Sequence, residues 1–143
     1  MLKRNSDKLQ NAMKSLEEAI KYSRSGEFQG LGSEFKNVLQ AAVVQNYSLT
    51  FKVCMQMLTY QLMDKHGEEA VEGHSPDAIL RMAAGDKLIS SLDSWLEYLD
   101  CEHLTQSSSI AVRTFEKASA FLADAAELLT TCDKRSNNER RRR

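Results

Sequence analysis

Residues that interrupt helices are scarce in this sequence. Its 143 residues include one proline and six glycines, and three of those glycines fall together between Ser25 and Ser33. So few interruptions leave room for long helices, and they do not provide the frequent turns of a many-stranded sheet. The sequence therefore favours an all-α protein.

Long apolar segments are also missing. No apolar run approaches the roughly 20 residues that are needed to span a bilayer. The N-terminal stretch MLKRNSDKLQ is polar and lacks the apolar core of a signal peptide. We therefore expect a cytoplasmic protein that does not enter a membrane.

Motifs of catalytic and metal sites are absent as well. There is no glycine-rich phosphate loop, no H-E-x-x-H and no nucleophile elbow. The cysteines have no C-x-x-C spacing, which argues against a disulfide framework or a zinc site and favours buried thiols. The three cysteines are Cys54, Cys101 and Cys132, and the three histidines are His66, His74 and His103. Because the histidines are scattered, we expect no metal site and no cofactor.

The charge of the chain is unevenly distributed. Residues 133–143 carry a net charge of +4, and residues 1–132 carry a net charge of −5. An acidic body is a poor general binder of nucleic acid, because phosphates need cations to neutralise them. We expect a single domain over residues 1–132 and a basic, disordered tail over residues 133–143.

Apolar residues recur at helical spacing along most of the chain. Such stripes, together with start and stop signals, predict helices over about Ser6–Arg24, Glu34–His66 and Pro76–Gly85, then one from about Ser91 and one that ends near Cys132. Ser6 and Ser75 are the expected N-caps. Helices of these lengths predict an antiparallel four-helix-bundle-like domain with about five helices.

The longest predicted helix is apolar over a wide arc. Two neighbouring stripes, one through Leu49 and Val53 and one through Tyr47 and Phe51, place it at the centre of the bundle or in a subunit contact. Its methionines indicate packing or a subunit contact rather than a cofactor pocket, and they are Met55, Met57 and Met63.

Three blocks of sequence resemble a known family when taken together. They are VVQNYSLTFKVCMQML (43–58), HSPDAILRMAAGDKLI (74–89) and WLEYLDCEHLTQSSS (95–109). Their order and separation are similar to those of the nucleotidyltransferase substrate-binding proteins, a branch of the HEPN superfamily. The resemblance implies a helical bundle that forms a homodimer, and a small nucleotidyltransferase partner that would handle any nucleotide or RNA. In related HEPN proteins an Arg-x4–6-His motif at the dimer interface cuts RNA, and the nucleotidyltransferase acts as antitoxin.

The third block departs from the family at its reactive positions. Counted from Trp95, Glu102 stands where the family has arginine, His103 where it has asparagine, and Ser107 where it has histidine. Cutting RNA needs a cation to stabilise phosphate charge and an imidazole to move a proton. Glu102 has the wrong sign and serine does not titrate near neutral pH, so we expect no catalytic residue in this chain. The resemblance implies a degenerate motif, or a substrate pocket, at Trp95, Glu102, His103, Thr105 and Ser107.

The first block keeps the apolar frame of the family but changes its charged face. Asn46, Ser48, Lys52 and Gln56 stand where the family has Arg, Glu, Glu and Lys, and Gln45 is retained. Through the resemblance, these five residues form the candidate partner-binding face.

Three hypotheses follow from the sequence. The first is a non-catalytic substrate-binding subunit that homodimerises and docks a small nucleotidyltransferase, in a system like a toxin–antitoxin pair. The second is a HEPN-type ribonuclease toxin with a rearranged site that uses His103. The third is a helical scaffold or adaptor without a nucleotide role, which a fold alone does not exclude.

Overall fold

The structure is all helical in the part of the chain that it describes. The computed structural model describes residues 2–24, 33–103 and 108–142. The α-helices of these ranges are α1 (Leu2–Arg24), α3 (Ser33–His66), α4 (Pro76–Gly85), α5 (Leu92–His103) and α6 (Ser108–Arg142), with a short 3-10 helix η1 (Glu68–Ala70). No strand occurs in these ranges, which confirms the predicted fold class. None of the described helices is long and apolar enough to cross a membrane.

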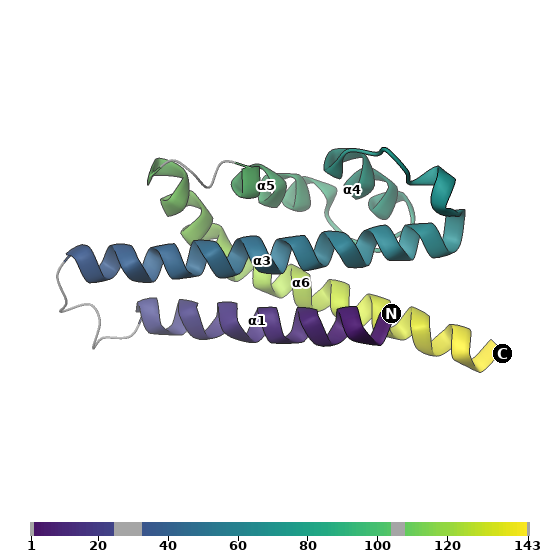
Figure 1. Cartoon of the computed structure of the whole chain (residues 1–143), viewed down its shortest axis with the longest axis horizontal. Coiled ribbons are helices and arrows are strands. Elements are labelled where there is room, and N and C mark those ends of the chain that lie inside the picture. Colours follow the sequence, from purple (N-terminus) through teal and green to yellow (C-terminus); the bar gives the residue numbers. More distant parts are fainter. Residues whose placement is uncertain (1, 25–32, 104–107, 143) are drawn as a thin grey trace.

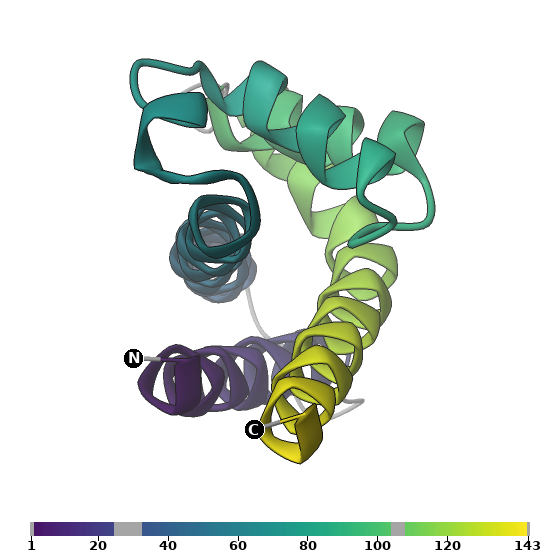
Figure 2. The same cartoon turned by 90° about the vertical axis from the view of Figure 1, so that its right-hand side faces the viewer.

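The helices form an antiparallel bundle whose third side is divided between two short helices. Figure 1 shows α1 and α3 side by side and running in opposite directions, with α4 and α5 following one another back along α3. The last helix, α6, then crosses the bundle obliquely and returns toward the end where the chain starts. Seen from the end in Figure 2, α1, α3, α6 and the α4–α5 pair surround a common core.

The first and last helices, α1 and α6, extend beyond their predicted limits. Helix α1 begins at Leu2, so Ser6 lies inside the helix and is not its N-cap. The buried Ser6 hydroxyl instead donates to the carboxylate of Asp133 on α6, at 3.1 Å. Helix α6 continues past Cys132 to Arg142, where a disordered tail was expected. That segment contains no glycine or proline, and lysine, arginine and glutamate are good helix formers.

Both ends of α4 are capped by local hydrogen bonds, one predicted from the sequence and one not. Ser75 is its N-cap, as predicted, and its hydroxyl accepts from the amide of Ala78 at 3.3 Å. The helix ends at Gly85, but the residue with a left-handed backbone is Lys87, at φ 60°. The amides of Lys87 and Leu88 return to the carbonyls of Ala84 and Ala83, at 3.1 and 2.9 Å. These bonds close the helix in the manner of a Schellman motif and turn the chain into α5.

Five aromatic rings occupy the centre of the core. They come from three helices and are Tyr47 and Phe51 (α3), Trp95 and Tyr98 (α5) and Phe121 (α6). The ring of Phe121 lies 4.6 to 6.1 Å, centroid to centroid, from each of the other four. The Tyr47 hydroxyl donates to the backbone carbonyl of Tyr98 at 2.8 Å, and the Tyr98 hydroxyl donates to Asp124. This cluster joins α5 and α6 to α3 and sets the position of the α5 C-terminus.

Candidate functional site

A groove of about 780 Å³ runs along one side of α3. The N-terminal part of α1 forms one wall, and the segment before α4 together with the end of α5 forms the other. Helix α3 contributes most of the lining residues, which are Phe51, Lys52, Met55, Gln56, Thr59, Tyr60 and Met63. The others are Asn5 and Lys8 from α1, His74 from the segment before α4, Pro76 as the first residue of α4, and Leu99 and Glu102 from α5. Four segments that are distant in sequence therefore meet around one hollow.

Helix α3 can line this groove because it is long and two-sided. Residues such as Val43, Leu58 and Leu62 are fully buried against the other helices. Lys52 and Gln56 lie on a different side and are exposed. Residues three and four apart share a helix face, so this side carries both the exposed polar residues and the half-buried Met55 and Met63 of the groove. Met55 and Met63 pack against the core, as the sequence predicts, and they also line the groove, whereas Met57 is buried in the core.

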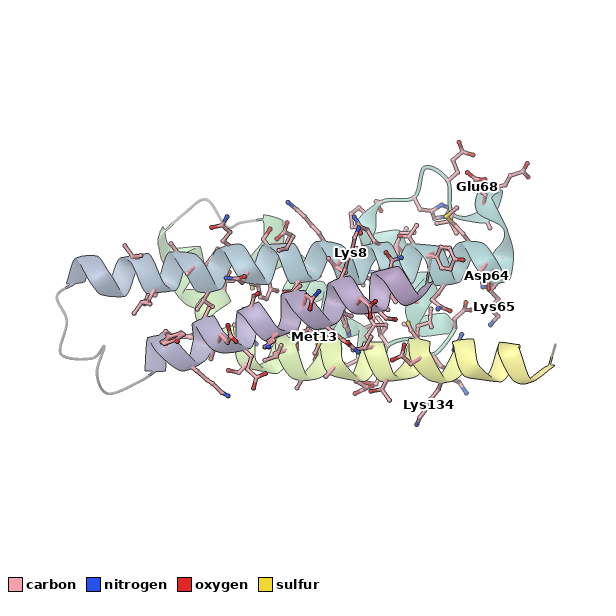
Figure 3. All side chains as sticks on the ribbon, turned by 60° about the horizontal axis from the view of Figure 1, so that its bottom comes forward. Lys8, Met13, Asp64, Lys65, Glu68 and Lys134 are labelled. Carbon is pink, nitrogen blue, oxygen red and sulfur yellow. The ribbon has the colours of Figure 1, made fainter. Side chains whose placement is uncertain are left out.

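Two lysines border the groove from different helices. Lys8 belongs to α1 and Lys52 to α3, and both are exposed. Figure 3 shows Lys8 where α1 lies alongside α3. Neither ammonium group forms an ion pair with any described residue, whereas Lys21, Lys65 and Lys117 are each paired with a carboxylate. The half-buried carboxylate of Glu102 lies on the opposite wall.

The histidine of the groove has one ring nitrogen committed to the backbone. Nδ1 of His74 lies 3.1 Å from the carbonyl oxygen of Val71 and 3.4 Å from that of Glu72. A carbonyl only accepts hydrogen bonds, so Nδ1 carries the hydrogen in this arrangement. Nε2 is then the nitrogen that can meet a ligand, as an acceptor when the ring is neutral and as a donor when it is charged.

The structure describes the side chains of two predicted motif residues, Trp95 and Glu102, and they lie in different surroundings. Trp95 is buried inside the aromatic cluster, 5.7 Å from the Tyr98 ring and 5.9 Å from the Phe121 ring between centroids. Glu102 lies in the groove. His103 is the last residue of α5, and its side chain lies outside the described part of the chain, as do Thr105 and Ser107. In the described ranges, no three side chains of the types that ligate metals gather in one place.

The predicted partner-binding face follows one side of α3 with a single exception. Gln45, Ser48, Lys52 and Gln56 recur at spacings of three and four. Asn46 falls outside this row, and its side-chain amide donates to the Ala42 carbonyl at 2.8 Å. Two exposed apolar side chains also lie on α3, Val38 at 65% and Leu49 at 53%.

The two predicted sets of residues meet in the groove. Lys52 and Gln56 come from the partner-binding face and Glu102 from the degenerate motif. Sequence analysis did not find Lys8, Asn5 or His74, because no local pattern connects α1 or the segment before α4 with the middle of α3. A weak signal was available in α3 itself, where Lys52 and Gln56 interrupt the apolar stretch of residues 51–58 at a spacing of four.

Several groups with raised pKa values lie in the core of the bundle. Burial raises the pKa of the Tyr47 hydroxyl and of the Cys54 thiol well above their usual values. Burial, followed by the hydrogen bond to Asp124, does the same for Tyr98. The pKa of the Cys132 thiol is raised to about 11, first by burial and then by the neighbouring charge of Asp133. A buried thiol that keeps its proton is a poor nucleophile, and both Cys54 and Cys132 pack within the core.

Comparison with known proteins identifies a family and a solved structure with a similar fold. A search of curated proteins finds no match. HI0074 from Haemophilus influenzae, whose structure is described as revealing the fold of a substrate binding domain of a nucleotidyltransferase, superposes with a TM-score of 0.81 at 22% sequence identity. The superposition covers 90% of this chain and 98% of HI0074. The family described as "nucleotidyltransferase substrate binding protein like" matches residues 4–134. Because this match covers most of the chain, including every described wall of the groove, the chain belongs to the nucleotidyltransferase substrate binding protein-like family.

Proposed function

We propose that this chain is the non-catalytic, substrate-binding subunit of a two-component nucleotidyltransferase. It forms a homodimer and docks a separate small nucleotidyltransferase, as in a toxin–antitoxin-like pair. The observation that carries the proposal is the family match over residues 4–134, which spans nearly the whole bundle. The fold shared with HI0074, described as that of a substrate binding domain of a nucleotidyltransferase, supports a substrate-binding role for this chain and a catalytic role for the partner.

Features of α3 support docking on its exposed side. Gln45 and Lys52 are exposed on the predicted partner-binding face, and the exposed Leu49 adds apolar area beside them. Protein interfaces combine apolar contact with polar groups that give specificity. The absence of catalysis in this chain is supported by Glu102, which supplies a negative charge where an RNA-cutting site needs a cation.

The test is a pull-down of the tagged full chain from its own host, with the eluted proteins identified by mass spectrometry and the complex sized by light scattering. A complex of two copies of this chain with an identified nucleotidyltransferase is the expected result. Gln45→Arg should remove the nucleotidyltransferase, because it places a charged, longer side chain on the docking face outside the groove. Gln10→Arg, at an exposed position of α1, is the matched control and should retain it.

Two results would contradict the proposal. A monomer or bare homodimer without a nucleotidyltransferase would leave only a helical scaffold. Cleavage of RNA by the purified chain, abolished by His103→Ala, would replace the binding subunit by a ribonuclease.

A further inference from the structure

The groove along α3 has the size and shape of a small-molecule site. Its volume of about 780 Å³ lies within the roughly 300–1,000 Å³ that is usual for ligand pockets. It is concave and is walled by α1, α3, the segment before α4 and α5, so a ligand would contact several elements at once. A concave groove of this size suits a small-molecule ligand better than it suits a protein partner with a flat surface.

The floor of the groove is apolar and includes two methionines. The Phe51 ring is 2% exposed and Leu99 is 7% exposed, so both present the edge of the core to the hollow. Met55 and Met63 are half-buried beside them. Unbranched thioether side chains adapt to irregular shapes and make favourable contacts with aromatic rings. The floor therefore suits a ring-bearing or otherwise apolar body.

The rim of the groove selects the charge of the ligand. Lys8 and Lys52 line the rim from two helices without an ion pair in the described part of the chain, and Nε2 of His74 adds a third donor when its ring is charged. Two unneutralised ammonium groups at one hollow attract an anion, more strongly where water is partly excluded. The net charge of −5 over residues 1–132 disfavours a long polyanion such as RNA. A single anionic group on a small body is the charge pattern that fits both facts.

We infer that the groove binds a small organic anion, with its apolar, ring-sized body on Phe51, Met55 and Leu99 and its phosphate or carboxylate between Lys8 and Lys52. The Glu102 carboxylate on the far wall accepts a hydrogen bond from a hydroxyl or amino group of such a ligand. That this ligand is the substrate presented to a nucleotidyltransferase rests on the proposed function, whereas its binding to the isolated chain does not.

The experiment is a titration of the isotope-labelled full chain with phenyl phosphate, followed by backbone amide NMR shifts. Phenol and inorganic phosphate, which carry the ring alone and the anion alone, are titrated separately. Saturable shifts that centre on the groove are expected, with weaker binding of either half molecule. The double variant Lys8→Gln/Lys52→Gln should weaken binding about tenfold, because two partly exposed charge pairs are lost.

Two further variants make the result specific. Lys134→Gln removes an exposed lysine of α6 that points away from the bundle in Figure 3, and it should leave the affinity unchanged. Met55→Glu places a negative charge at the floor and should abolish binding while the amide spectrum stays that of the folded chain. Shifts spread over the whole surface, equal losses in Lys134→Gln, or inorganic phosphate binding as tightly as phenyl phosphate would overturn the inference. Because no partner is present in this titration, its failure leaves docking of the nucleotidyltransferase untouched, and a failed pull-down leaves ligand binding untouched.

Discussion

Phe121 offers the sharpest test of how this bundle is held together. Its side chain is fully buried and its ring meets four others, at centroid distances of 4.6, 5.2, 5.9 and 6.1 Å. Replacing a buried phenylalanine by alanine costs about 3–5 kcal/mol through lost burial and the cavity that remains. Lost aromatic pairing adds about 0.5–1.5 kcal/mol per pair beyond burial, although such contributions are not additive. Phe121→Ala should therefore fall near the upper end of this range.

The assay is urea unfolding at 25 °C, followed by far-ultraviolet circular dichroism. Because domains of this kind are stable by about 5–15 kcal/mol, Phe121→Ala can approach unfolding, and Phe121→Leu is the companion variant. It keeps most of the apolar volume and should cost about 1–2 kcal/mol. Tyr22→Ala removes an aromatic ring that is 57% exposed, and it should cost less than about 1 kcal/mol. A loss below about 2 kcal/mol for Phe121→Ala, with an unchanged denaturant slope, would refute the central role of this ring.

Three smaller perturbations test individual contacts in the same unfolding assay. Ser75→Ala should lower the free energy of unfolding by about 1 kcal/mol, because the Ala78 amide loses its cap; an unchanged midpoint would show that water replaces the hydroxyl. Tyr47→Phe should cost about 1 kcal/mol for the lost bond to the Tyr98 carbonyl, and a loss near that of Phe121→Ala would show that the hydroxyl organises the whole cluster. Burial raises the pKa of Cys132 from 9.0 to about 11. The folded chain thus keeps a proton that the unfolded chain releases, so the stability that is present below about pH 9 should decline as the pH rises to about 11. Cys132→Ala should make this decline shallower, and an identical pH profile would exclude the thiol as its source.

Much of the candidate site was beyond the reach of sequence analysis. Lys52 and Gln56 on α3 and Glu102 on α5 were all found through the resemblance to a known family. Lys8 and His74 were missed, since they enter the groove only when α1 and the segment before α4 pack beside α3. Trp95 was placed near a pocket, whereas its size and apolar surface bring it into the aromatic core.

The sequence by itself determined the helices, because capping, apolar periodicity and the scarcity of glycine and proline act over a few residues. Ser75 at the start of α4 is the clearest case, since its hydroxyl and the amide that it caps are three residues apart. Tertiary structure alone decided which helix faces meet, where α6 crosses the bundle, and that lysines from α1 and α3 border one groove. These outcomes depend on packing between segments far apart in the chain, where the burial of rings such as Phe121 selects one arrangement among many that local propensity allows.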